Sequence, residues 1–427
     1  MIWLVLLAGA ALLASGAAVA YAVGAASVLT FLATDNARYL AILPQRMFSQ
    51  VDVFALMAMP LFILVGEIMN HAGITRALID FAMSIVGRLK GGLGHVNIMA
   101  AVFLSGISGS AVADAAALGS TIVPEMREKG YKLSYAAALT AAASMIGPII
   151  PPSIIMVFYG ALMQTSVAAM FVGGILPGLL LAGFLFAANA WFAHRHDHPG
   201  GAGEAVPALW PSLWRALPAL SLPVIILGGI VFGVVTPTEA AALAVIAALA
   251  VGFHYGGLNA ANLKLGLLQT ASLTGTIFML LGAVSVLDWL AGLEQLPQML
   301  ARTVSSAGLS PTEYMVVLNV FFVVVGTLLE PPVALALLVP LLAPSALELG
   351  IHPVHLGITL CLNLTIGMIT PPMGGSLMIV SAVTRVGYLE LNRAILPFVL
   401  VETALLFVIA LVPEISLFLP RQFGLIK

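Results

Sequence analysis

Two proline pairs, Pro151-Pro152 and Pro371-Pro372, stand in the middle of long apolar segments and could create binding sites for an ion. Proline has no N–H group, and its ring collides with the carbonyl four residues earlier in a helix. The first proline of each pair therefore leaves the carbonyl of Gly147 or Gly367 without its helical partner. An unpaired carbonyl costs several kcal/mol in the lipid core, so a small cation is its natural partner there. A helix kink that neighbouring helices or water repair is the alternative.

The chain that follows each proline pair could bind an anion. A new helix begins there, and the N-terminus of a helix carries a partial positive charge that suits a carboxylate. Each break could thus bind a cation through its carbonyls and an organic acid through the N-terminus of the new helix.

The proline pairs belong to a longer repeat, in which Pro151 and Pro371 are 220 positions apart. The other positions on this offset are Gly106 with Gly326, Pro124 with Pro344, Gly130 with Gly350, Gly147 with Gly367, and Ile175-Leu176-Pro177 with Ile395-Leu396-Pro397. A duplicated membrane unit with a broken helix in each copy is typical of secondary transporters, and the breaks mark the binding site.

Before each break lies a long apolar stretch, 91–124 or 311–344, that is interrupted near its middle by Gly, Ser, Thr or Pro residues. Each half has about 15 residues, below the roughly 20 that a span requires. We therefore predict two re-entrant helical hairpins with tips at mid-membrane. Irregular backbone is tolerated at that depth only where protein or a cavity surrounds it.

The tips and breaks supply the predicted sodium ligands, through carbonyls, hydroxyls and closely approaching glycines. They are Ser105, Gly106, Ser108, Gly109, Ser110, Gly147, Pro148, Ile150, Gly326, Thr327, Gly367, Met368 and Thr370. The predicted substrate contacts overlap with this set and add nearby polar groups. They are Ser108, Ser110, Asp114, Pro151, Pro152, Ser153, Glu330, Asn363, Pro371, Pro372 and Gly374. For any single Ser or Gly, small-residue packing between helices is the alternative.

Carboxylates inside membrane segments are functional candidates by default. Asp114 either favours the start of a helix or lines the cavity, and for Glu330 in the second tip we expect a polar role beside the site. Glu239 follows Thr236-Pro237-Thr238, a pattern that predicts helix capping. For Glu67 we expect buried pairing or snorkelling.

The composition is that of a polytopic membrane protein. The chain is 61% hydrophobic and 8% charged, with a mean hydropathy of +1.11, whereas soluble domains have about 25% charged residues. A net charge of −2 argues against nucleic acid as a partner, and the single Cys361 excludes an internal disulfide. The sequence has no Ser/His/Asp grouping, P-loop, HExxH or CxxC, so no enzymatic activity is predicted.

The apolar segments outside the hairpins are long enough to span a bilayer. The predicted spans are 2–32, 51–70, 136–159, 168–193, 216–235, 239–255, 267–291, 356–380 and 395–418. Basic residues flank the first hairpin on both sides, so the positive-inside rule places its ends in the cytoplasm. Five predicted spans then separate the two hairpins. Because an odd number reverses direction, we expect the two copies to be inverted.

The spans divide this predicted all-α polytopic membrane protein into scaffold and repeat segments. They are an N-terminal scaffold with an interfacial helix (1–90), a first repeat (91–193), a cytoplasmic linker (194–215), a second scaffold (216–310), a second repeat (311–418) and a tail (419–427). Each repeat holds a hairpin (91–124 or 311–344), a Pro-Pro-broken helix (136–159 or 356–380) and one following span.

Several motifs resemble the large membrane subunit (DctM-like) of the tripartite ATP-independent periplasmic (TRAP) transporters, over nearly the whole chain. They are Met59-Pro60-Leu61-Phe62-Ile63-Leu64-Val65-Gly66-Glu67-Ile68-Met69-Asn70, Gly91-Gly92-Leu93, the run from Ser105 to Gly119, Gly147-Pro148-Ile149-Ile150-Pro151-Pro152-Ser153, Thr236-Pro237-Thr238-Glu239-Ala240-Ala241 and Thr370-Pro371-Pro372.

This resemblance implies a multi-pass protein of the bacterial inner membrane with the elevator-type fold of the ion transporter superfamily. It implies sodium-driven import of an organic acid, such as a C4-dicarboxylate, sialic acid or another carboxylate. It also implies two partners, a small four-helix membrane subunit (DctQ-like) and a periplasmic solute-binding protein (DctP-like). The sodium sites would then lie where each tip meets its break.

Other functions fit the same pattern. One alternative is a stand-alone sodium/dicarboxylate or citrate symporter, which would need no binding protein. The others are a channel and a scaffold for another enzyme, and the two opposed hairpins argue against both because neither function requires them. No Arg or Lys lies at either tip or break, so carboxylate binding would depend on helix ends, hydroxyls and amides, or on Arg38 or Arg46 of an outer loop.

Overall fold

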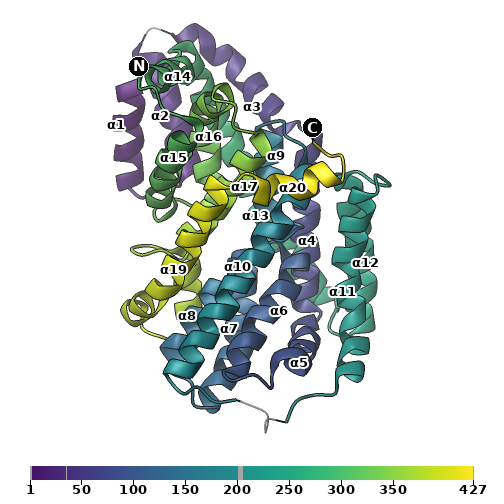
Figure 1. Ribbon diagram of the computed structural model, residues 1–427. Helices are drawn as coiled ribbons and strands as arrows, with labels where there is room; N and C mark the ends of the chain where they lie inside the picture. Colours follow the sequence, from purple (N-terminus) through teal and green to yellow (C-terminus); the bar gives the residue numbers. More distant parts are fainter. Residues whose placement is uncertain (1, 35, 201–204, 427) are drawn as a thin grey trace.

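The computed structural model describes residues 2–34, 36–200 and 205–426, and over these ranges its regular elements are all helical (Figure 1). Seven of the described helices are long and apolar enough to cross a membrane. They are Phe54–His71, Val167–Arg195, Leu209–Val231, Pro237–His254, Ala260–Leu293, Pro331–Glu348 and Tyr388–Leu411. The prediction of an all-α polytopic membrane protein is confirmed.

The first apolar segment forms two helices, so the prediction of one span over 2–32 is wrong. Gly16 has φ 87°, a left-handed conformation that glycine adopts readily at the end of a helix. The backbone N–H of Gly16 donates to Leu13 O at 3.0 Å, which closes the first helix. The elements of this region are α1 (Ile2–Ala14), α2 (Val19–Ala33), η1 (Ala37–Ile42), α3 (Leu43–Val51), η2 (Phe54–Met57), α4 (Ala58–His71) and α5 (Ile74–Val86).

The first hairpin and the first broken helix follow one another through short loops. They comprise α6 (Gly92–Ser108), α7 (Ala111–Glu128), α8 (Leu133–Ser144) and α9 (Ile154–Leu162), and α10 (Val167–Arg195) comes next. The hairpin arms have 17 and 18 residues and are longer than expected, because α7 continues through Pro124.

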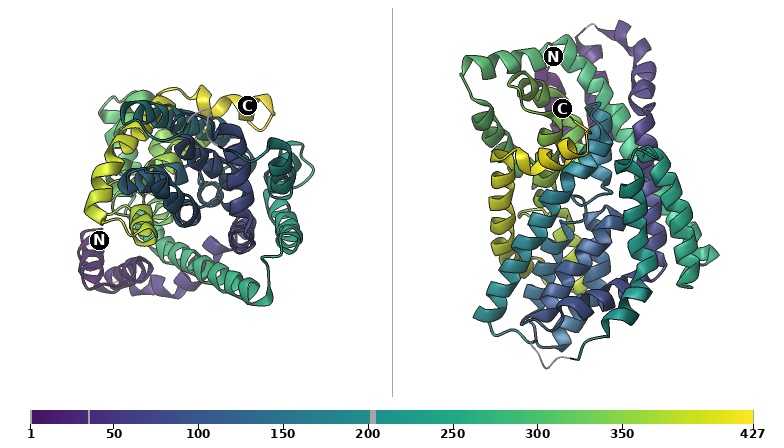
Figure 2. Two further views of the ribbon diagram at one scale, coloured as in Figure 1. Left: turned by 90° about the horizontal axis from the view of Figure 1, so that it is seen from below. Right: turned by 45° about the vertical axis from the view of Figure 1, so that its right-hand side comes forward.

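Four helices connect the two halves. They are α11 (Leu209–Val231), α12 (Pro237–His254), α13 (Ala260–Leu293) and α14 (Leu296–Ser306). The capping predicted for Glu239 is confirmed, since its carboxylate accepts from the backbone N–H of Thr236 at 2.8 Å while Thr236 caps α12. Figure 2 shows α11 and α12 as a pair on the outside of the bundle.

The second half repeats the order of hairpin, broken helix and long helix. It comprises α15 (Pro311–Gly326), α16 (Pro331–Glu348), α17 (Pro353–Gly367), α18 (Gly375–Thr384), α19 (Tyr388–Leu411) and α20 (Glu414–Gln422). By length and composition α16 could cross a membrane, so this hairpin arm is also longer than expected. Residues 419–422 of the predicted tail belong to α20.

The predicted linker 194–215 is shorter than expected, because α10 continues to Arg195 and α11 begins at Leu209. Residues 201–204 of this linker lie outside the described residues.

The first part of the linker is tied to the start of the first hairpin. Lys90 Nζ lies 2.6 Å from Asp197 Oδ1, and this hydrogen bond together with the charge of Lys90 lowers the pKa of Asp197 below its ordinary value. The carbonyl of Pro199 accepts from the N–H of Gly91 at 3.1 Å and from the hydroxyl of Tyr131 at 2.9 Å.

The two helices that lead into the breaks form the centre of the molecule. Residues 136–144 of α8 and 354–367 of α17 are buried on every side, as expected for helices that lie inside a bundle. In Figure 1, α6 and α7 occupy the lower part of the molecule and α15 and α16 the upper part, so the hairpins approach the centre from opposite ends.

Candidate ion and substrate site

The first proline pair separates two helices. The helix α8 stops at Ser144, residues 145–153 are not α-helical, and α9 follows. Ser153 is fully buried, caps α9 and donates its hydroxyl to the carbonyl of Pro148. One carbonyl that the prolines free therefore has a partner within the protein.

The tip of the first hairpin touches this break. Gly109 turns the chain with φ 58°, and a Cβ at this position would collide with the carbonyl oxygen of Pro152. Ser110 starts α7 by accepting from the N–H of Ala113 at 3.4 Å. The backbones of tip and break are therefore in direct contact.

Asp114 joins the tip to the break from the first turn of α7. It is 1% exposed, and the hydroxyl of Ser108 donates to its Oδ1 at 2.6 Å. Its Oδ2 has no hydrogen-bond partner among the described residues. A Cβ at Gly147 would collide with this oxygen, so it lies against the backbone of the break. A carboxylate oxygen next to backbone carbonyls that are not part of a helix is a suitable environment for a small hard cation, because such ions bind oxygen ligands.

Other predicted ligands of the first site have structural partners. The hydroxyl of Ser105 donates to the carbonyl of Val102 at 2.6 Å. A Cβ at Gly106 would collide with the ring of Pro223 in α11, so this glycine permits close helix packing. The side chain of Ile150 packs against Gly178 of α10.

The second proline pair also separates two helices, α17 and α18. The carbonyl of Met368 accepts from the N–H of Ser376 at 3.0 Å, and the hydroxyl of Thr370 donates to the carbonyl of Ile366 at 2.8 Å. Pro372 O accepts from the hydroxyl of Tyr388 at 2.9 Å. Pro371 lies in the same non-helical segment, which ends at Gly374 with φ 47°.

The second tip touches the second break through two glycines. A Cβ at Gly367 would lie 2.5 Å from the carbonyl carbon of Gly326, so the two backbones are in contact. The hydroxyl of Thr327 donates to the carbonyl of Val324 at 2.7 Å. Glu330 stands at the N-cap position of α16 but makes no capping hydrogen bond.

An amide pair lies one turn before the second break. The side-chain nitrogen of Asn363 donates to both the carbonyl and the side-chain oxygen of Asn319 at 2.9 Å. Both residues are completely buried, and Asn363 Oδ1 has no partner among the described residues. The sequence analysis missed Asn319, although a polar residue inside an apolar hairpin is a signal that could have found it.

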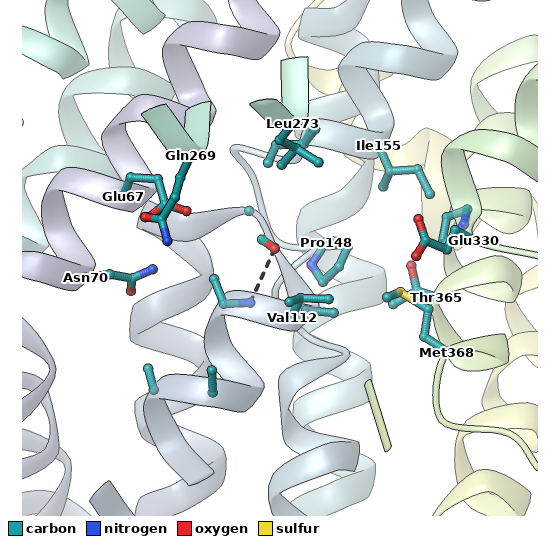
Figure 3. A pocket seen from close by; sticks show the side chains of 18 of the residues that line it. Glu67, Asn70, Val112, Pro148, Ile155, Gln269, Leu273, Glu330, Thr365 and Met368 are labelled. Carbon is teal, nitrogen blue, oxygen red and sulfur yellow. Dashed lines mark hydrogen bonds between the residues drawn. The ribbon is translucent and has the colours of Figure 1, made fainter. Parts of the chain in front are cut away.

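A cavity of about 860 Å³ lies between α4 and α13 on one side and α7, α9, α16 and α17 on the other (Figure 3). Its volume is near the upper end of the range in which proteins bind small molecules, roughly 300–1,000 Å³. The predicted residues that line it are Gly109, Ser110, Pro148, Glu330 and Met368.

The remaining predicted residues do not line this cavity. They are Ser105, Gly106, Ser108, Asp114, Gly147, Ile150, Pro151, Pro152, Ser153, Gly326, Thr327, Asn363, Gly367, Thr370, Pro371, Pro372 and Gly374. The outer-loop arginines lie elsewhere as well, since Arg38 stacks on Tyr39 and Arg46 stacks on Trp289. The arginine at the cavity is Arg76 of α5, which the sequence analysis missed.

Polar side chains of α4 and α13 also line the cavity. They are Glu67, Asn70 and His71 of α4 and Gln269 of α13. We expected buried pairing or snorkelling for Glu67, but its side chain is about one quarter exposed at the cavity and His71 Nε2 lies 3.9 Å from its carboxylate. The sequence analysis did not select the other three, because which face of each helix meets the cavity depends on the tertiary fold.

These features define a helical membrane transport protein, with two hairpins that each meet a proline-broken helix beside a shared cavity. The chain belongs to the family of the DctM component of tripartite ATP-independent periplasmic transporters, whose model matches residues 6–415. The family predicted from the motifs is confirmed, and the chain is a transport subunit and not an enzyme.

Two relatives support this membership over most of their length. The sialic acid TRAP transporter large permease SiaM of Vibrio cholerae is 39% identical over 396 residues, which cover 92% of this chain and 93% of that protein. The C4-dicarboxylate TRAP transporter large permease DctM of Pseudomonas aeruginosa is 36% identical over 403 residues, covering 94% of this chain and 93% of that protein.

A solved structure has a similar fold. The YdaH transporter of Alcanivorax borkumensis superimposes with a TM-score of 0.64 over 91% of this chain and 90% of that protein. At 15% identity this likeness concerns the fold alone.

Proposed function

We propose that this chain is the sodium-driven large subunit of a TRAP transporter that imports an organic acid across the bacterial inner membrane. A periplasmic binding protein (DctP-like) delivers the acid, and a small four-helix subunit (DctQ-like) completes the membrane part. The observation that carries this proposal is the free carboxylate oxygen of Asp114 against the backbone of Gly147. Burying an ionised carboxylate without a partner is costly, and a bound cation removes this cost.

In this proposal the two repeats, 91–193 and 311–418, are inverted copies that together form the moving unit of an elevator. The segments 1–90 and 216–310 form the scaffold past which this unit moves. The cavity supports this division, because α4 and α13 of the scaffold form one wall and elements of both repeats form the other. A substrate held there would contact both units.

Each tip–break contact would hold a sodium ion. At the first contact, Asp114 and the carbonyls of the opened backbone would be the ligands. At the second contact, the backbone around Gly326 and Gly367 would provide carbonyl oxygens. The start of α7 would bind the acid, and a sodium ion held by Asp114 would add positive charge beside it.

Uptake into liposomes tests the proposal. The chain is reconstituted with its small subunit and its binding protein, and uptake of labelled N-acetylneuraminate and of labelled succinate is measured. We expect uptake of the accepted acid to require an inward sodium gradient and to fall at least about tenfold when potassium replaces sodium, since one lost ion contact costs more than 1.4 kcal/mol. Equal uptake in both salts would contradict sodium coupling. Uptake by the chain alone would instead favour a stand-alone symporter.

A further inference from the structure

Four polar side chains form one face of the cavity, and we call them the scaffold wall. Glu67, Asn70 and His71 follow one another at i, i+3 and i+4 on α4, so they lie on the same side of that helix. Gln269 of α13 lies beside them, and its side-chain oxygen is 3.4 Å from His71 Nε2. Figure 3 shows Glu67, Asn70 and Gln269 together on one side of the cavity, with Glu330 on the other.

The scaffold wall has unused hydrogen-bonding capacity. His71 lies 3.4 Å from Gln269 and 3.9 Å from Glu67, so neither contact is a short hydrogen bond. Asn70 makes no side-chain hydrogen bond within the described ranges, although its amide can both donate and accept. The side chains of Glu67 and His71 are each about one quarter exposed. They can therefore bind a ligand without first breaking strong contacts.

The scaffold wall faces the place where an acid would bind. A Cβ at Gly66, the neighbour of Glu67, would lie 3.3 Å from the carbonyl oxygen of Ser108, so α4 packs against the first tip. The helix α7 begins beyond this tip at Ala111, with Ser110 as its N-cap. If the carboxylate of an organic acid binds at this helix start, the rest of the acid lies next to the scaffold wall.

The charges around the cavity do not suit a second carboxylate. Glu67 and Glu330 are acidic, and Arg76 is the only Lys or Arg among the described residues that line the cavity. Two carboxylates, of Asp80 at 3.5 Å and of Glu125 at 3.9 Å, lie beside Arg76 and offset its positive charge. A second carboxylate would therefore meet like charge, whereas hydroxyl groups could donate to Glu67 and to the Gln269 oxygen and accept from Asn70.

We propose that the scaffold wall makes this transporter selective for monocarboxylates that carry several hydroxyl groups, such as sugar acids, over dicarboxylates and unsubstituted fatty acids. This inference rests on the proposed transport function and specifies its substrate class. Asn70, His71 and Gln269 are the specificity-determining residues, and the acid group binds on the opposite side of the cavity.

Ligand binding to the purified full-length chain tests this inference without its partners. The probes are D-gluconate, hexanoate and adipate, which share a six-carbon chain, and N-acetylneuraminate as a larger hydroxylated monocarboxylate. Dissociation constants are measured by thermal stabilisation in sodium buffer. We expect at least one hydroxylated acid to bind about tenfold or more tightly than hexanoate and adipate, since several hydrogen bonds are gained. Equal or tighter binding of adipate or hexanoate, or no binding of either hydroxylated acid at millimolar concentration, would overturn the inference.

Substitutions locate the selectivity. Gln269→Ala and Asn70→Ala should each weaken binding of the hydroxylated acid by about three- to tenfold, the value of one hydrogen bond, and leave hexanoate unchanged. Leu268→Ala is the matched control, since Leu268 is 58% exposed and does not line the cavity. Cooperative thermal unfolding near the temperature of the unsubstituted chain shows that each variant is folded, and unchanged selectivity in folded variants would contradict the role of the wall.

The same experiment in potassium buffer separates this inference from the proposed function. If the hydroxylated acid binds equally well in potassium, sodium coupling fails but the substrate class stands. If binding requires sodium but adipate binds most tightly, the function stands and the substrate class fails.

Discussion

Each hairpin tip contacts the proline break of its own repeat, and these two contacts are alike in their backbone but differ in their charged groups. In both, a glycine of one element allows the other element to approach, at Gly109 in the first contact and at Gly326 and Gly367 in the second. The first contact also contains a buried carboxylate, Asp114, whereas the second has the uncharged pair Asn319 and Asn363 one turn away.

This difference indicates how each contact would hold a cation. At the first contact a full negative charge can neutralise the ion, and Ser108 orients one carboxylate oxygen while the other is free. At the second contact the ion would depend on carbonyl and amide dipoles, which bind more weakly than a charged ligand. We therefore expect the first contact to dominate sodium affinity.

The largest expected effect comes from removing this charge. Asp114→Asn keeps the size of the side chain but leaves a bound cation without its counter-charge. The loss of one partner from a buried ion pair costs roughly 3–5 kcal/mol. Sodium-driven uptake should therefore fall by about a hundredfold or more, as measured in proteoliposomes over a range of sodium concentrations.

Glu313→Gln is the control for this variant. Glu313 caps α15 at the outer end of the second hairpin, far along that arm from the tip. Its substitution should leave the sodium dependence unchanged. If Asp114→Asn retained the sodium dependence of the unsubstituted protein, the buried charge that distinguishes the first contact from the second would not contribute to sodium binding.

A smaller effect is expected from filling the second contact. In Gly367→Ala the added methyl group would collide with the backbone of Gly326, which cannot move aside as a side chain can. Overpacking of this kind costs typically 1–3 kcal/mol. We expect a lower unfolding temperature and weaker stabilisation by sodium than in the unsubstituted chain.

Gly375→Ala tests whether this effect is local. Gly375 begins α18 at the same break and has nothing within 4 Å of an added Cβ. This variant should unfold at the temperature of the unsubstituted chain. Equal behaviour of the two alanine variants would show that close contact between Gly326 and Gly367 is not needed.

The backbone features of the site could be predicted from the sequence, because proline and glycine act locally. The proline pairs predicted that the segments 136–159 and 356–380 are each broken, because two adjacent prolines remove two consecutive N–H donors from a helix. A single proline does not have this effect here, since α7 continues through Pro124. The division of the first apolar segment at Gly16 was missed, because one glycine in an apolar run also occurs inside continuous membrane helices.

The side chains around the cavity were harder to predict. Asn363 was expected to contact the substrate, but it is buried against Asn319 and does not line the cavity. Glu67 and Gln269 are 202 positions apart in the sequence and lie on the same wall of the cavity. Which face of α4 or α13 meets the cavity depends on tertiary packing, and no local pattern in the sequence specifies it.

The most direct test of the proposed sodium sites is a pair of high-resolution cryo-electron microscopy maps of the complete transporter, one in sodium and one in N-methyl-D-glucamine. We expect compact density between Asp114 Oδ2 and the backbone of Gly147 in sodium, weaker density at the second contact, and neither feature without sodium. Identical density in the two maps, with both breaks well ordered, would contradict the account.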